Sequence, residues 1–309
     1  MFLGIEIGGT KLQMGLGRGD GSLVALQRLT VNVAEEAAGI RRQILKCVPQ
    51  LLDAARMPRS ELQGMAFGFG GPVDDATRRT LRSHQVSGWD DFPLADWAEQ
   101  NLGIPAHLGN DADAAGLAEA LFGAGHGLSP IFYVTVGSGI GGALVIDGEI
   151  FRGCGRGAGE IGHLWVVHDV HHQDPGALDP TWRPLELCSS GWAIARAAAA
   201  ESAQAVVAAA TAGDAGAKQV LDTARRRLAL ALTHVIALCC PRRIIIGGGV
   251  SLMGDALFFE PLRAEVNTWA FKPFVGCYDI VPAALGEEVV VHGALALARK
   301  MYEKRRDQG

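Results

Sequence analysis

Residues 131–148 have the sequence IFYVTVGSGIGGALVIDG. An apolar run leads into a bend of glycines, and the chain then continues as a second apolar run that ends at Asp147-Gly148. Short runs rich in β-branched residues are typical of strands, so this stretch predicts two strands joined by a glycine bend. Gly137, Gly139 and Gly142 also match the GxGxxG pattern of dinucleotide-binding loops, but that pattern requires a helix directly after the loop. The strand that follows excludes this interpretation.

The beginning of the chain repeats the same plan. The run Phe2–Ile7 leads into Gly8-Gly9-Thr10-Lys11, then into an alternating stretch over residues 12–16 and a glycine-rich turn. A strand, a glycine bend and a second strand form a hairpin, not a strand-to-helix unit. One such hairpin lies near the start of each half of the chain, which indicates a duplicated architecture.

Helical patterns lie between the glycine clusters. Apolar residues at helical spacing, or a high alanine content, predict helices over residues 37–56, 113–122, 192–210 and 218–240. Short apolar runs predict further strands over residues 65–69, 106–108 and 244–246. Strands that alternate with helices indicate an α/β fold.

The composition excludes several classes of protein. The chain has 309 residues, of which 49% are hydrophobic and 20% charged, so it can bury a large core. Its 28 basic and 33 acidic residues give a net charge of −5, which does not favour nucleic-acid binding. We find no apolar run of the roughly 18–20 residues that span a bilayer, and no signal peptide. The 6 cysteines show no CxxC spacing and are typical of a reduced, cytoplasmic protein.

The two glycine bends favour phosphate binding. Successive backbone N–H groups at a glycine bend form an anion-binding concavity without any net basic charge. Two bends that face each other across a cleft would hold a polyphosphate, with Thr10 and Ser138 as further donors and Glu6 holding Mg²⁺ through water. Each bend alone is equally an ordinary tight turn. Their occurrence as a pair within one strand–bend–strand plan favours the phosphate-binding interpretation.

Several stretches, in order along nearly the whole chain, resemble the ROK family of repressors, open reading frames and sugar kinases. The resemblance is carried by Glu6-Ile7-Gly8-Gly9-Thr10-Lys11, Asn110-Asp111-Ala112-Asp113-Ala114-Ala115, Val136-Gly137-Ser138-Gly139-Ile140-Gly141-Gly142, Ala158-Gly159-Glu160-Ile161-Gly162-His163 and Ile246-Gly247-Gly248-Gly249-Val250-Ser251. It implies an α/β fold of two actin-like (ribonuclease H-like) ATPase lobes with a central cleft. We place the first lobe at residues 1–110 with a final helix over 293–309, and the second lobe at residues 111–292.

The resemblance also implies the site residues. Asp111 would be the general base that takes a proton from a sugar hydroxyl. The sugar would be bound by Asn110, Glu160, His163 and Glu186. ATP and its phosphates would be bound by Gly8, Gly9, Thr10, Lys11, Gly137, Ser138, Gly139, Gly247, Gly248 and Gly249. From the residues alone, Asn110 and Asp111 are equally a helix N-cap pair, and Glu160 and His163 an ordinary surface pair.

The chain departs from the family pattern at three places. The family's zinc site combines a histidine, here His163, with three cysteines that this sequence lacks, so we expect no zinc site. His168, His171 and His172 are expected in a solvated loop, with metal binding as the alternative. Glu6 replaces an aspartate, and Gly70 replaces a proline.

The leading hypothesis is an ATP- and Mg²⁺-dependent hexose kinase. The expected acceptor is the 6-hydroxyl of glucose, fructose, mannose or an N-acetylhexosamine. The alternatives are a polyphosphate-dependent hexokinase and a catalytically silent sugar-binding sensor. A repressor is not expected, because the phosphate motif begins at Glu6 and leaves no room for a preceding helix-turn-helix module. We expect a homodimer or larger homo-oligomer without nucleic-acid or membrane partners.

Overall fold

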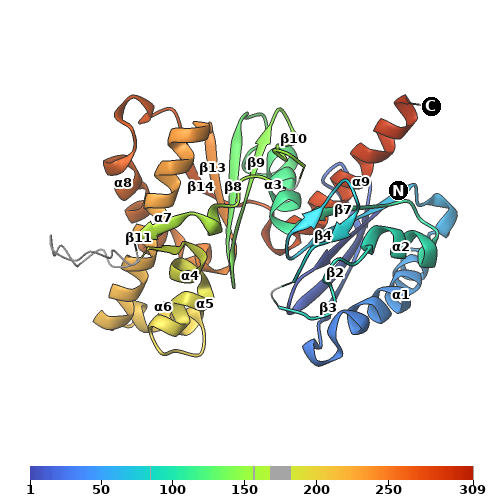
Figure 1. The fold of residues 1–309 in the computed structure, drawn as a ribbon, viewed down its shortest axis with the longest axis horizontal. Coiled ribbons are helices and arrows are strands. Elements are labelled where there is room, and N and C mark those ends of the chain that lie inside the picture. The colour runs from blue at the N-terminus through green and yellow to red at the C-terminus, as the bar shows by residue number, and fades with distance from the viewer. Residues whose placement is uncertain (84, 156, 168–181, 309) are drawn as a thin grey trace. The chain divides into compact units, whose positions relative to one another are not determined.

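The computed structural model describes residues 1–83, 85–155, 157–167 and 182–308. The chain divides into two compact units. The first unit comprises Met1–Gly127, Gly148–Ala158 and Ala284–Gly309, and the second comprises Leu128–Asp147 and Gly159–Ala283. Each unit is described below by itself, with the element labels of Figure 1.

The first unit is built on a sheet with the strand order β3-β2-β1-β4-β7. Its strands are β1 (Phe2–Ile7), β2 (Lys11–Gly17), β3 (Leu23–Thr30), β4 (Gly64–Phe69) and β7 (Ala106–Asn110). β1 pairs antiparallel with β2 and parallel with β4, and β4 pairs parallel with β7. The bend between β1 and β2 is closed by the N–H of Gly8, which donates to the carbonyl of Lys11 at 3.0 Å. The predicted glycine hairpin is therefore confirmed.

Helices cover both faces of this sheet (Figure 1). Because side chains alternate along a strand, Leu3 and Ile5 join the core that contains residues of α1 (Glu36–Ala54) and α2 (Leu94–Leu102). The opposite face of β1 packs against α9 (Val289–Asp307). There, a Cβ added to Gly4 would lie 2.7 Å from the carbonyl oxygen of Val291, so the backbone of α9 approaches the strand closely.

The helix α3 (Asp111–Phe122) follows β7 directly and packs against α9. A Cβ added to Gly293 would lie only 1.8 Å from the carbonyl oxygen of Ala114, so glycine allows the two helix backbones to touch. The buried Glu119 also accepts the N–H groups of Ala284 and Leu285, both at 2.9 Å. These contacts explain why the compact first unit includes α3, which the sequence-based division assigned to the second lobe.

The second sheet repeats the plan of the first, with the order β10-β9-β8-β13-β14. Its strands are β8 (Ile131–Val136), β9 (Ile140–Ile146), β10 (Glu149–Ile150), β13 (Arg243–Gly247) and β14 (Asp279–Pro282). β8 pairs antiparallel with β9 and parallel with β13, as β1 does with β2 and β4. The predicted duplication and the α/β class are therefore confirmed.

The helices of the second unit bury the apolar side chains of its sheet. Val134, Ile244 and Ile246 share one core with residues of the long helix α7. The helices are α4 (Glu186–Ser189), α5 (Gly191–Ala197), α6 (Ala203–Thr211), α7 (Ala215–Cys239) and α8 (Glu260–Trp269). The short strands elsewhere are β5 (Val73–Asp74), β6 (Arg79–Thr80), β11 (Trp165–Val167) and β12 (Trp182–Pro184). Among the described helices, none is long and apolar enough to cross a membrane.

The prediction of one helix over residues 192–210 is wrong. The chain leaves the helical conformation after α5, and Ala199 adopts a positive φ of 48°. A new helix, α6, then begins after Ser202, whose side chain accepts the N–H of Ala205 at 3.2 Å. Serine is a preferred N-cap residue because its hydroxyl satisfies a free N–H of the first turn. The uniform alanine content of this region concealed the break.

Candidate active site

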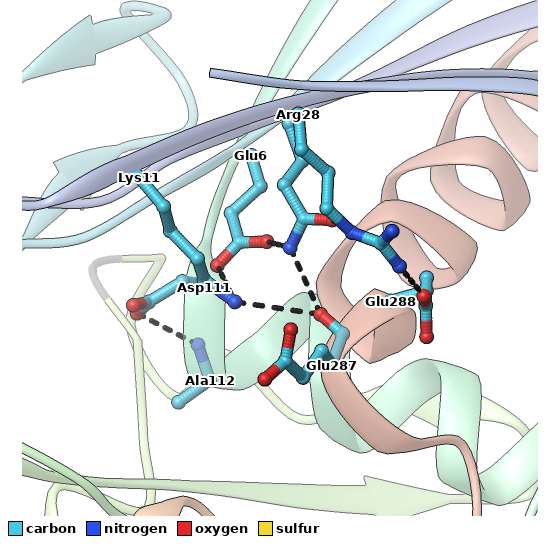
Figure 2. Close-up of polar contacts among 8 residues, drawn as sticks. Glu6, Lys11, Arg28, Asp111, Ala112, Glu287 and Glu288 are labelled. Atoms are coloured by element: carbon cyan, nitrogen blue, oxygen red, sulfur yellow. Dashed lines mark hydrogen bonds and ion pairs between the residues drawn. The ribbon is translucent and has the colours of Figure 1, made fainter. Parts of the chain in front are cut away.

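Asp111 is the first residue of α3 and directly follows the last residue of β7. Its Oδ1 accepts the N–H of Ala112 at 2.8 Å (Figure 2). Asn110 caps the same helix, because its Oδ1 accepts the N–H groups of Ala112 at 2.8 Å and Asp113 at 3.2 Å. A helix N-terminus and a donated N–H are both favourable surroundings for a carboxylate. This position keeps Asp111 a candidate for the general base.

Asp111 lies close to the first glycine bend. A Cβ added to Gly70 would lie 3.5 Å from Oδ2 of Asp111 and 3.6 Å from Cα of Gly8. The N–H of Gly70 donates to the carbonyl of Ile7 at 2.8 Å, which joins the end of β4 to the end of β1. The first unit therefore brings together the candidate base and the candidate phosphate-binding residues.

Glu6 is buried, and both of its carboxylate oxygens have nitrogen partners (Figure 2). Nζ of Lys11 lies 3.1 Å from Oε1, and Nε2 of Gln13 donates to Oε2 at 2.9 Å. Burial raises the pKa of Glu6 above its usual value, and the charge and hydrogen bond of Lys11 oppose this rise. The loss of hydration therefore outweighs the stabilisation of the anion by its partners.

The polar network continues from Glu6 to the segment that leads into α9. The carbonyl of Glu287 accepts Nε2 of Gln13 at 3.0 Å and Nζ of Lys11 at 3.4 Å. Arg28 donates to Oε1 of Gln13 at 3.2 Å and pairs with Glu288 (Figure 2). Gln13 was not among the predicted site residues, although its amide side chain within the alternating stretch 12–16 was a usable signal.

The second unit brings its own predicted phosphate and nucleotide residues together. β8 and β13 are parallel neighbours, so the residues that follow them lie at the same edge of the sheet. A Cβ added to Gly248 would lie 2.6 Å from the carbonyl oxygen of Val136, directly before the second bend. Within that bend, the N–H of Gly137 donates to the carbonyl of Gly139 at 3.0 Å. Ser138 is exposed, as is Thr10 in the first unit.

The predicted sugar-binding residues of the second unit also cluster. Oε2 of Glu186 accepts the N–H of Ile140 at 2.8 Å. Glu160 precedes a short helical turn, Ile161–His163, in which a Cβ added to Gly162 would lie 2.1 Å from the carbonyl oxygen of Ile140. Burial raises the pKa of Glu160, the charge of His163 opposes this rise, and the charge of Glu186 adds to it. These three side chains are thus close enough to interact electrostatically.

The carboxylates of the first unit meet only part of what a magnesium site requires. Mg²⁺ in kinase sites is held by one or two carboxylates, with water and substrate phosphates as its other ligands. Glu6 and Asp111 supply such carboxylates near Gly8, but Lys11 and Gln13 already engage Glu6. Within the described residues, no group of three or more His, Cys, Asp and Glu side chains is arranged to hold a metal. His168, His171 and His172 lie outside the described residues.

Comparison with known proteins identifies the family and the fold. The sequence model of the ROK family matches residues 2–301. The chain is 29% identical to a glucokinase of Halalkalibacterium halodurans, over 100% of this chain and 97% of that protein. It also resembles the crystal structure of a ROK hexokinase from Thermus thermophilus, with 26% identity, a TM-score of 0.80 and 99% of each chain covered.

A second solved structure is informative because it contains ligands. It is a ROK family glucokinase from Streptomyces griseus in complex with glucose and AMPPNP. The identity is 28% and the TM-score 0.75, and the match covers 97% of this chain and 99% of that chain. The family and the fold predicted from the sequence are therefore confirmed.

Proposed function

Because the chain belongs to the ROK family, we propose that it is a sugar kinase that transfers the γ-phosphate of ATP to a hexose. The proposed acceptor is the 6-hydroxyl of glucose, fructose, mannose or an N-acetylhexosamine. The glucokinase relative supports a sugar as the acceptor. The Streptomyces griseus glucokinase, solved with glucose and AMPPNP, supports ATP as the donor.

The observation that carries the proposal is the position of Asp111 at the start of α3, beside the bend at Gly8. In the proposed reaction, the Asp111 carboxylate takes the proton of the acceptor hydroxyl while the hydroxyl oxygen bonds to the γ-phosphorus. The bond between the γ-phosphorus and the bridging oxygen breaks, and ADP leaves with that electron pair. Phosphoryl transfer depends mainly on positioning and charge stabilisation, so one carboxylate base is sufficient.

The other predicted residues take supporting roles in this proposal. Residues of the two bends surround the phosphate oxygens: Gly8, Gly9, Thr10, Lys11, Gly137, Ser138 and Gly139. The N–H groups of Gly8 and Gly137 close the bends themselves, so the phosphates accept N–H groups and hydroxyls of the other bend residues. Gly247, Gly248 and Gly249 bind the adenosine, and Asn110, Glu160, His163 and Glu186 bind sugar hydroxyls. A magnesium ion, when bound, supplies positive charge to the phosphates, and Glu6 would hold it through water.

The test is an ADP-release assay on the wild type and Asp111→Asn over a panel of hexoses. We expect the wild type to turn over at least one hexose, and kcat of the variant to fall by at least ~10²-fold, the usual scale for removing a general base. The asparagine keeps an oxygen that accepts the N–H of Ala112, so its thermal unfolding should match that of the wild type. Full activity of Asp111→Asn would remove this residue from the mechanism.

The same assay separates the two alternatives. Inorganic polyphosphate replaces ATP in a second arm, and phosphorylated sugar is measured directly. Turnover with polyphosphate but not with ATP would replace the proposed donor. Hexose binding by calorimetry without turnover on either donor would identify a sensor and overturn the kinase.

A further inference from the structure

The segment from Glu186 to Gly191 holds the second glycine bend at both ends. At one end, Oε2 of Glu186 accepts the N–H of Ile140 at 2.8 Å. At the other, the N–H of Gly191 donates to the carbonyl of Gly137 at 2.8 Å. The bend is thus attached to a neighbouring segment as well as to the strands that it joins.

The two glycines within this bend differ in what surrounds them. A Cβ added to Gly139 would lie 2.5 Å from Oε2 of Glu186, whereas one added to Gly137 would meet no atom within 4 Å. Neither residue has a positive φ, so the backbone conformation itself tolerates alanine at both positions. The Glu186 carboxylate therefore occupies the space in which a side chain at position 139 would lie.

Glu186 extends from a well-anchored position. It is the first residue of α4, and the preceding Leu185 is fully buried. The N–H of Leu185 donates to the carbonyl of Leu164 at 2.8 Å, and Nη1 of Arg227 donates to the carbonyl of Cys188 at 3.2 Å. The segment that carries Glu186 is therefore held in place independently of the contact with Ile140.

We propose that Glu186 is a positioning residue for the donor phosphates, through its hydrogen bond to the second bend. It fixes Ile140, and with it the N–H groups of residues 138 and 139, which precede it in the bend. The inference rests on the proposed function, in which the same carboxylate also binds a sugar hydroxyl. One side chain then contacts the sugar and holds the bend that binds the nucleotide, so binding of the hexose and binding of the nucleotide are thermodynamically coupled.

A Glu186 that positions the bend and a Glu186 that only binds the sugar would have opposite effects on nucleotide affinity. A carboxylate beside bound phosphates repels them, so a Glu186 that contacts only the sugar would weaken nucleotide binding, and its removal would strengthen it. A positioning Glu186 has the reverse effect, because without it the phosphate-binding N–H groups are no longer held in place. The affinity for nucleotide in the absence of sugar therefore distinguishes the two roles.

The first experiment compares Glu186→Ala with Glu186→Gln, which keeps an oxygen to accept the N–H of Ile140. We expect Glu186→Ala to bind AMPPNP about tenfold more weakly by calorimetry without sugar, and Glu186→Gln to bind it at least as tightly as the wild type. The amide of Ile140 should exchange with solvent at least tenfold faster in Glu186→Ala and at the wild-type rate in Glu186→Gln. AMPPNP affinity of Glu186→Ala equal to or above that of the wild type would overturn the proposal.

The second experiment approaches the contact from the bend. Gly139→Ala should displace the Glu186 carboxylate and speed exchange at Ile140, but add little when Glu186 is already alanine. Gly137→Ala is the matched control, because its methyl group meets open space and should leave exchange at Ile140 unchanged. Additive effects of Gly139→Ala and Glu186→Ala would contradict the proposed contact.

These results separate the positioning role from the proposed function. The exchange rate of Ile140 is measured without ligand, and AMPPNP binding is measured without turnover. A wild type that binds AMPPNP but phosphorylates no hexose would overturn the kinase alone. Unchanged AMPPNP affinity in Glu186→Ala, with an active wild type, would overturn the positioning role alone.

Discussion

At the scale of single residues, the surroundings of His107 keep its side chain neutral. It lies in β7, and its Nε2 is 3.0 Å from Nη2 of Arg305. Burial lowers the pKa of His107 to about 4, and the charges of Arg305 and Arg78 contribute to this shift. Because the guanidinium can only donate, Nε2 accepts and the proton of the neutral ring is on Nδ1.

This shift predicts how stability depends on pH. The folded-state pKa lies below the value of about 6.5 for an unfolded chain, so the unfolded state binds the proton more readily. The stabilising contribution is complete above about pH 6.5 and is lost as the pH falls from there towards about 4. Urea unfolding between pH 7 and pH 4.5 should show a weaker pH dependence in His107→Gln than in the wild type. The exposed His126 provides the control, since His126→Gln should keep the wild-type dependence.

At this scale, residue type and spacing predicted the chemistry but not the contacts. The two bends were predicted because paired glycines have a local chemical meaning, whereas the role of Asp111 was implied by the resemblance to the ROK family. The partners of Glu6, Lys11 and Gln13, by contrast, also donate to the carbonyl of Glu287, which lies more than 270 residues further along the chain. The spacing of Gly70 from Asp111 and Gly8 was equally hidden, because it depends on how β4 is placed beside β1. No local pattern encodes such neighbours.

The pair α3 and α9 is the clearest example at the scale of elements. Gly293 allows the helices to touch, since its added Cβ would lie 1.8 Å from a backbone oxygen of Ala114. We expect Gly293→Ala to lower the free energy of unfolding by about 1–3 kcal/mol, the usual cost of overpacking, as measured by urea titration. An unchanged free energy of unfolding would contradict the close contact between the two helix backbones.

Gly216 in α7 provides the matched control for this substitution. Its added Cβ would lie 3.3 Å from one atom, Oδ1 of the N-cap residue Asp214, so a shift of a few tenths of an ångström makes room for it. Alanine favours a helix over glycine by roughly 0.5–1 kcal/mol, so Gly216→Ala should unfold at an equal or higher urea concentration than the wild type.

Elements with a strong local pattern were predicted closely. The strands Phe2–Ile7 and Ile131–Val136 have the predicted bounds, because each is an apolar run that ends at glycine. The helix α3 begins two residues earlier than predicted, at Asp111, because Asn110 rather than a later residue caps it. The break between α5 and α6 was missed because alanine has the highest helix propensity, so an alanine-rich run predicts a continuous helix.

At the scale of the molecule, three separate stretches of chain form the first unit. Ending the chain after Glu288 would remove α9 and uncover the sheet face that includes Phe2 and Ala66. We expect hydrogen exchange to show lost protection in β1 and β4, while β8 and β13 stay protected by their own core. Equal loss in both sheets would contradict the division into two units.

The duplicated sheet plan was visible in the sequence, whereas the assignment of the final helix, residues 293–309, to the first lobe came from the resemblance to the ROK family. Two glycine bends in equivalent settings were enough to predict two similar halves. The return of residues 284–309 to the first unit depends on helix contacts such as Gly293 with Ala114 and Glu119 with Ala284. Those contacts have no signature within a local window.

The α9 helix also has a consequence for how the protein is made on the ribosome. The strands β1 and β4 emerge early, whereas the helix that covers them is translated only after the whole second unit. At about 5–20 residues per second, this delay lasts roughly ten seconds or more. During that time the nascent chain presents an uncovered apolar surface, which is the kind of surface that chaperones bind. The sheet that is synthesised first is thus the one whose helical cover is completed last.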